Sequence, residues 1–144
     1  MSNNFSSNIN LLYFNVRSLL PKIDDLRAIC AVYCPDIVCI VETWLDDTIL
    51  DSEVSIQGYS LCRLDRSRHN GGILIFVKSL FTYSLLFNGS VDFECLVMSV
   101  NSSKCNVSSP DFTVVLFYRP PNSGHAPLDT LFSTLCNTFF IMLF

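Results

Sequence analysis

One short run of sequence, Ile37-Val38-Cys39-Ile40-Val41-Glu42, says more about this chain than its composition does. A run of apolar, mostly β-branched residues predicts a strand buried on both faces, and this one stops at a carboxylate. A second apolar run, Leu11-Leu12-Tyr13-Phe14-Asn15, stops at an amide. Because open α/β sheets bind ligands beyond the carboxyl ends of their strands, we expect Glu42 and Asn15 to lie at one end of a sheet.

The segment between these runs completes a β-α-β unit. Residues 18–33 carry apolar side chains at helical spacing, and Pro21 falls near the first turn, where its missing N–H costs nothing. The sequence Cys34-Pro35-Asp36 ends the helix. We therefore expect parallel strands joined by a right-handed crossover.

The rest of the chain is rich in predicted strands. Residues 45–55 are acidic and irregular, and short turns that favour antiparallel neighbours separate the runs that follow. The predicted strands cover residues 59–64, 72–78, 81–87, 92–100 and 112–118, and a predicted helix covers 128–138. The expected class is α/β (α+β), a mixed sheet with helices on its outer face.

Composition limits the chain to one domain and gives no global signal for nucleic acid. Its 144 residues have a formal net charge of -4, whereas nucleic-acid binding usually shows as a basic face. Half of the residues are apolar and only 15% are charged, so we expect apolar surface without its natural cover. A local basic cluster of Arg63, Arg66, Arg68 and Lys78 remains a candidate contact for an acidic partner.

Cysteine usage and the absence of targeting signals indicate an intracellular protein of the cytoplasm or nucleus. The seven cysteines are odd in number and form no C-x-x-C pair, so we expect a reducing compartment and no disulfide partner. The polar start Met1-Ser2-Asn3-Asn4 is no signal peptide. No apolar stretch reaches the roughly 18–20 residues that span a bilayer, so we expect no membrane association.

Five short motifs occur in an order that resembles the endonuclease/exonuclease/phosphatase superfamily, and within it the apurinic-type endonuclease domain of LINE-like (non-LTR) retrotransposons. Each motif alone is weakly specific, whereas the five in order over about residues 9–130 are specific. They are Phe14-Asn15-Val16-Arg17-Ser18-Leu19, Pro35 to Leu45, Gly58-Tyr59 followed by Arg63-Leu64-Asp65-Arg66, Gly71 to Val77, and Phe117-Tyr118-Arg119-Pro120-Pro121-Asn122-Ser123.

The resemblance implies a fold and a set of roles. The family fold is a four-layer α/β sandwich of two mixed sheets, and this chain is similar to its first half. Glu42 matches the carboxylate that holds a catalytic Mg²⁺ (or Mn²⁺), with Asn15 as the amide beside it. Tyr118 matches the tyrosine that faces the scissile phosphate. DNA is the implied partner, and the implied phosphate contacts are Arg17, Arg66, Arg68, Arg119 and Asn122.

The chain also departs from the family pattern. It contains neither the later Gly-Asp-Phe-Asn-like segment nor the final Ser-Asp-His-like segment, and its histidines, His69 and His125, follow no aspartate. General-base catalysis alone is worth about 10²–10⁴-fold, so we expect an inactive, truncated endonuclease domain. We expect a disordered N-terminus (1–8), the truncated domain (9–134) and a divergent apolar tail (135–144). We also expect the second sheet to be missing, which leaves the first sheet's inner face open to self-association.

Ordinary structural interpretations stay open beside these. Glu42 is also compatible with a capping residue, Asn15 with a turn residue and Tyr118 with a strand-end tyrosine. The arginines are equally compatible with ion pairs to the acid-rich segment or with a solvated turn. The alternative functions are a non-catalytic nucleic-acid-binding module and a fold remnant without function.

Overall fold

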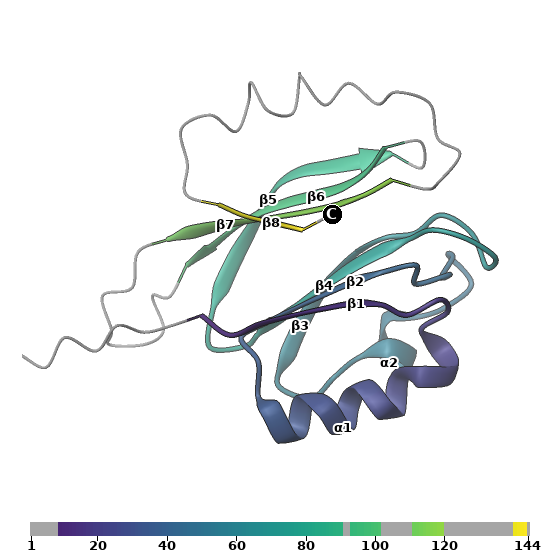
Figure 1. Cartoon of the computed structure of the whole chain (residues 1–144), viewed down its shortest axis with the longest axis horizontal. Helices are drawn as coiled ribbons and strands as arrows, with labels where there is room; N and C mark the ends of the chain where they lie inside the picture. The colour runs from purple at the N-terminus through teal and green to yellow at the C-terminus, as the bar shows by residue number, and fades with distance from the viewer. Residues whose placement is uncertain (1–8, 91–92, 102–110, 120–139, 144) are drawn as a thin grey trace, which may run out of the picture.

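The computed structural model describes residues 9–90, 93–101, 111–119 and 140–143. Within these residues the chain forms two four-stranded sheets with strand orders β1-β2-β4-β3 and β5-β6-β7-β8. The sheets lie face to face, and α1 lies on the opposite side of the first sheet (Figure 1). The elements are β1 (Leu11–Asn15), η1 (Leu20–Lys22), α1 (Ile23–Tyr33), β2 (Ile37–Val41), α2 (Asp51–Val54), β3 (Tyr59–Leu64), β4 (Ile73–Lys78), β5 (Thr82–Ser90), β6 (Phe93–Asn101), β7 (Phe112–Tyr118) and β8 (Phe140–Leu143).

The first sheet contains the predicted β-α-β unit. Strands β1 and β2 are parallel, whereas β4 runs antiparallel to both β2 and β3. The connection begins as the 3₁₀ turn η1, which holds the predicted proline, and continues as α1. The helix ends at Cys34, whose left-handed backbone lets its N–H donate to the Cys30 carbonyl at 2.9 Å.

Helix α1 covers the outer face of the first sheet, as predicted. Its buried residues Ile23, Leu26 and Cys30 join one core cluster with alternate residues of β2 and β4, among them Ile40 and Phe76. Alternation along each strand sends the intervening residues to the other face.

The second sheet is present and covers that other face, so the prediction of an uncovered inner face is wrong. Ile75 and Cys39 of the first sheet share a core cluster with Leu96, Met98 and Leu116 of the second. The error has a physical reason. The turn between β4 and β5 is short, with the Phe81 N–H donating to the Lys78 carbonyl at 2.9 Å, yet it carries the chain from one sheet to the other. The prediction of self-association assumed that this face was uncovered, and the second sheet covers it.

The second sheet is antiparallel from β5 to β7, as the short connections predicted, and β8 pairs parallel with β7. Strand β8 arises within the segment predicted as an apolar tail. In the part of the chain that the structure describes, strand β5 pairs with β6 alone. Its register shifts twice, between Leu85 and Phe87 and between Asn88 and Ser90.

Several predictions fall elsewhere. The predicted helix 128–138, the N-terminal residues 1–8 and Asn122 lie outside the described residues. The segment predicted to be irregular contains the short helix α2. Among the described residues, no helix combines the length and the apolar character that crossing a membrane requires.

Candidate active site

Four chain segments meet at one end of the first sheet. Asn15 pairs with Val41, Val41 pairs with Ile73, and Ile73 pairs with Leu64. We call this end of the sheet, where the row Asn15, Val41, Ile73 and Leu64 lies, the site edge, and the opposite end of the same strands the far edge. Because β1 and β2 are parallel, both leave the sheet here, so Asn15 and the residue after Val41, Glu42, are brought to the same edge.

The second sheet reaches the same place through β6. Glu94, near the start of that strand, pairs across the ladder with Tyr118 at the end of β7. The Glu94 carboxylate also accepts the Gly72 N–H at 2.7 Å, and Gly72 directly precedes the Ile73 of the site edge. The fold therefore brings Asn15, Glu42 and Tyr118 to one end of the sandwich, while their chemical roles remain predictions.

Left-handed backbone conformations gather at the site edge. Non-glycine residues with positive φ there are Arg17 (42°), Ser18 (78°), Glu42 (60°) and Trp44 (53°). Such conformations cost an L-residue roughly 1–2 kcal/mol each and persist only where the surroundings enforce them. They break the strand alternation, so the direction of the Glu42 side chain does not follow from the apolar pattern of β2.

A backbone network enforces these conformations. Residues 42–44 lie between two neighbouring segments. On one side the Ser18 N–H donates to the Glu42 carbonyl at 2.9 Å. On the other, the Thr43 N–H donates to the Gly72 carbonyl at 3.1 Å and the Trp44 N–H to the Gly71 carbonyl at 3.0 Å.

Trp44 holds one oxygen of the candidate metal ligand. Its indole N–H donates to Glu42 Oε2 at 2.6 Å, and both side chains are half-buried. A charge-assisted bond of this kind fixes the carboxylate's orientation. This contact has no signal in the sequence, because residues two apart in an ordinary strand point the same way but not toward each other. The left-handed turn at Glu42 and Trp44 makes the contact possible.

Glu94 is a site-edge residue that the sequence analysis missed. It is 1% exposed, and Arg66 Nη1 donates to its Oε1 at 3.0 Å. Burial raises the pKa of the Glu94 carboxyl and the nearby charge of Glu42 adds to the rise, although the Gly72 N–H and Arg66 oppose it. The one available signal was a single carboxylate at the start of an otherwise apolar strand.

The arginines among the predicted phosphate contacts differ in how far they are exposed. Arg66 pairs with Glu94 and keeps 28% of its side chain exposed. Arg68 is exposed. Hydrogen bonds from Thr48 lower the pKa of Asp46, and the charge of Arg68 lowers it further. Arg17 is exposed in the loop after β1, and Arg119 is exposed directly after β7.

Arg63, the remaining arginine of the basic cluster, lies in β3 directly before Leu64. Its Nε contacts Asp51 at 3.0 Å and Asp65 at 3.6 Å. These ion pairs give Arg63 a structural role within the first sheet's loops.

The donor atoms at the site edge fit a hard cation. Glu42 has a carboxylate and Asn15 an amide oxygen, which are ligand types that Mg²⁺ and Mn²⁺ accept. Within the described residues, no group of three or more His, Cys, Asp or Glu side chains could enclose a metal. Mg²⁺ usually keeps several waters and takes further oxygens from a phosphate, so these two oxygen ligands suit its chemistry.

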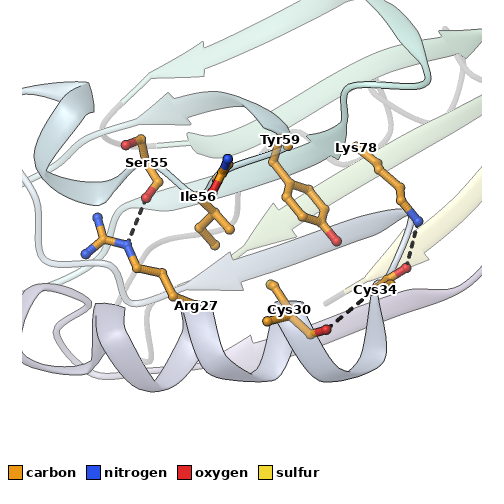
Figure 2. A pocket seen from close by; sticks show the side chains of 10 residues that line it. Arg27, Cys30, Cys34, Ser55, Ile56, Tyr59 and Lys78 are labelled. Carbon is orange, nitrogen blue, oxygen red and sulfur yellow. Dashed lines mark hydrogen bonds between the residues drawn. The ribbon is translucent and has the colours of Figure 1, made fainter.

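Among the described residues, two surface hollows near the first sheet can be compared with the candidate site, and the larger contains neither Asn15 nor Glu42. The smaller, about 260 Å³, includes Asn15 and Lys22 but not Glu42. The larger, about 650 Å³, lies at the far edge of the sheet, where Tyr59 pairs with Lys78 (Figure 2). Its basic groups already have acceptors: Arg27 donates to the Ser55 carbonyl and Lys78 to the Cys34 carbonyl (Figure 2).

Solved structures share this arrangement of sheets. The AP endonuclease LMAP from Leishmania major matches with a TM-score of 0.60 at 19% identity, over 85% of this chain and 43% of that one. The human Nocturnin catalytic domain matches with a TM-score of 0.59 at 15% identity, over 93% and 62%. The endonuclease domain of TRAS1, a telomere-specific non-LTR retrotransposon, matches with a TM-score of 0.57 at 14% identity, over 88% and 52%.

These likenesses show that the chain has the endonuclease/exonuclease/phosphatase fold, which confirms the predicted fold class. The chain spans between 43% and 62% of the length of the three structures. No protein-family model and no curated protein matches its sequence.

Proposed function

We propose that this chain is the N-terminal part of a metal-dependent DNA endonuclease domain of the LINE retrotransposon type, and that its 144 residues alone do not turn over. The observation that carries the proposal is the meeting of Asn15, Glu42 and Tyr118 at one end of the sandwich. The likeness to an AP endonuclease and to a non-LTR retrotransposon endonuclease domain supports the same substrate class.

In this proposal each residue has a defined task. Glu42 and Asn15 would hold Mg²⁺ or Mn²⁺, which when bound supplies Lewis-acid stabilisation of charge on a phosphoryl oxygen. Trp44 keeps the Glu42 carboxylate oriented through its indole N–H. The Tyr118 hydroxyl would donate to a phosphate oxygen, and the exposed Arg17, Arg68 and Arg119 would attract the DNA backbone.

The proposal of inactivity depends on the missing general base. The sequence has no aspartate followed by histidine and no later Asp-x-Asn segment. It therefore has no match to the groups that orient and deprotonate water in the family. A bound metal without a base loses the roughly 10²–10⁴-fold that proton transfer contributes.

A metal titration tests the cation site directly. Trp44 is the single tryptophan of the chain and contacts Glu42, so its fluorescence reports on that carboxylate. We expect saturable quenching by MnCl₂ that Glu42→Ala abolishes. Asp47→Ala, which removes an exposed acid from the same loop, is the matched control and should titrate like the parent chain. Equal titrations of the Glu42→Ala variant and the parent would contradict the site.

A plasmid-nicking assay with MgCl₂ tests the second half of the proposal. We expect the parent chain and Glu42→Ala to give the same background. Nicking that needs both Mg²⁺ and Glu42 would overturn the proposal of inactivity and establish a working nuclease.

The exposed arginines favour a non-catalytic nucleic-acid-binding module as the second candidate. Arg68→Ala should then lower the slope of log affinity against log salt for duplex DNA by about 1. Ser52→Glu, an exposed change in α2 with the same effect on net charge, is the control and should leave that slope unchanged. A slope that Arg68→Ala leaves at the parent's value would argue against the module.

A further inference from the structure

A buried carboxylate of the second sheet makes two contacts at the site edge of the first. Glu94 Oε2 accepts the Gly72 N–H at 2.7 Å, and its Oε1 accepts from Arg66 at 3.0 Å. With 1% of the residue exposed, this carboxylate has left water for these donors. Removing such a charge-assisted bond inside a protein is costly, because the remaining partner loses its acceptor.

The backbone that Glu94 holds is a tight left-handed corner. Gly71 and Gly72 have φ of 64° and 85°. A Cβ at Gly71 would lie 2.4 Å from Glu94 Oε1 and 2.5 Å from Arg66 Cδ, so the Glu94–Arg66 pair fills the space that the glycine leaves open. The ion pair fits only against a residue without a Cβ at position 71, and Glu94 in turn holds the corner by accepting the Gly72 N–H.

This corner is also the support of the Glu42–Trp44 segment. The Gly72 carbonyl accepts the Thr43 N–H and the Gly71 carbonyl accepts the Trp44 N–H. Trp44 in turn donates its indole N–H to Glu42. Three hydrogen bonds, joined through the Gly71–Gly72 peptide and through Trp44 itself, thus connect Glu94 to the Glu42 carboxylate.

We infer that Glu94 is a positioning residue: it fixes the Gly71–Gly72 corner and Arg66, and through the corner it holds Glu42 and Trp44 in the arrangement that binds a divalent cation. The inference rests on the proposed function, which makes Glu42 the cation ligand. Both Glu94 oxygens accept hydrogen bonds from the protein and only 1% of the residue is exposed, so in this inference Glu94 acts through other groups.

Two readouts of Trp44 test the inference, one with metal and one without. Glu94→Gln keeps the size of the side chain but replaces one acceptor oxygen with a donor that faces Gly72 or Arg66. We expect MnCl₂ affinity to fall about tenfold, the lower end of the effect of outer partners on metal sites. We also expect acrylamide, added without metal, to quench Trp44 more strongly because the corner loosens.

Glu53→Gln is the matched control. The exposed Glu53 carboxylate accepts the backbone N–H of Leu50 at 2.8 Å, and a glutamine there can keep this single bond through its amide oxygen, so the same substitution removes a charge without removing a hydrogen bond. This variant should match the parent chain in both readouts. Glu94→Gln that folds, judged by circular dichroism, and also matches the parent in both readouts would overturn the inference.

A second variant keeps the test decisive if Glu94→Gln does not fold. Arg66→Met removes one donor from Glu94 but leaves the Gly72 bond, so we expect smaller changes in the same direction. Parent-like values for Arg66→Met would then overturn the inference. If the parent chain shows no saturable response to MnCl₂, the proposed function fails, whereas the acrylamide readout still decides whether Glu94 positions Trp44.

Discussion

The two edges of the first sheet are built from the same strands but differ in backbone and in bonding. At the site edge, Glu42 and Trp44 adopt left-handed conformations that a network from both sheets enforces. At the far edge, the left-handed residues among those that the structure describes are Gly58, where this backbone carries little strain, and Cys34, which ends α1. The larger hollow lies at the far edge (Figure 2). The candidate residues thus coincide with a cluster of left-handed non-glycine residues, which is typical of functional sites, and not with the larger of these two hollows.

The largest expected effect separates two glycines with the same φ. Gly72 at the site edge (85°) and Gly58 at the far edge (84°) both exclude an L-residue at a cost of about 1–2 kcal/mol. A Cβ at Gly72 would also lie 2.3 Å from Thr43 Oγ1, whereas at Gly58 it meets nothing within 4 Å. Overpacking adds about 1–3 kcal/mol, so urea unfolding should show Gly72→Ala less stable than Gly58→Ala by that amount. Equal losses would erase the contrast between the edges.

A second prediction concerns strain at the candidate ligand itself. Glu42 has φ of 60°, so Glu42→Gly should be more stable than Glu42→Ala by about 1 kcal/mol, because only glycine adopts this conformation freely. Both variants should lose the Mn²⁺ response of Trp44. A more stable Glu42→Ala would mean that the backbone at this residue is not strained.

A third prediction compares one hydrogen bond at each edge. Trp44→Phe removes the indole N–H bonded to Glu42, and Tyr59→Phe removes the hydroxyl that donates to the Pro35 carbonyl at 2.6 Å. Each should cost about 1 kcal/mol in urea unfolding. Only Trp44→Phe should weaken Mn²⁺ binding in calorimetry, and a similar loss in Tyr59→Phe would show that the effect is not local.

The smallest effect at neutral pH concerns the cysteines. Burial raises the pKa of the Cys39 thiol, within the first sheet, to about 12. Cys34 at the far edge is exposed. At pH 8 iodoacetamide should therefore label Cys34 in the folded chain and leave Cys39 unmodified. Rapid labelling of Cys39 without denaturant would contradict the buried position of β2.

The same thiol predicts how stability changes in alkali. The folded pKa of Cys39 lies above its ordinary value of 9.0, so folding favours the neutral thiol. That contribution is fully present below about pH 9 and is lost as the pH rises toward about 12. Thermal unfolding of Cys39→Val should therefore depend less on pH in this window than unfolding of the parent chain.

The sequence predicted the positions of residues correctly where these follow directly from the pattern of apolar residues. The ends of two apolar runs placed Asn15 and Glu42 at one sheet edge, and the β-α-β unit was predicted correctly. It failed at the β4–β5 turn, because a short turn looks the same whether the next strand joins the old sheet or starts a new one.

The network around the site was equally hidden. Neither the left-handed backbone of Glu42 nor its bond to Trp44 has a signature in residue type. Nothing in the sequence distinguishes Glu94 from a solvent-facing carboxylate at the start of a strand. Only the packing of the two sheets makes it buried. Positions set by contacts between distant segments are therefore the part that a single sequence does not supply.

The two register shifts in β5 also affect how molecules of this chain meet one another. Leu85, Leu86 and Phe87 are large apolar side chains exposed on a strand that, among the described residues, pairs with β6 alone. A regular strand with this composition would be a template for intermolecular β-pairing and fibre growth. The first register shift leaves Leu86, between Leu85 and Phe87, without a paired residue in β6. Because such an irregularity disrupts the ladder locally, we expect a straight incoming strand to pair poorly along this part of β5.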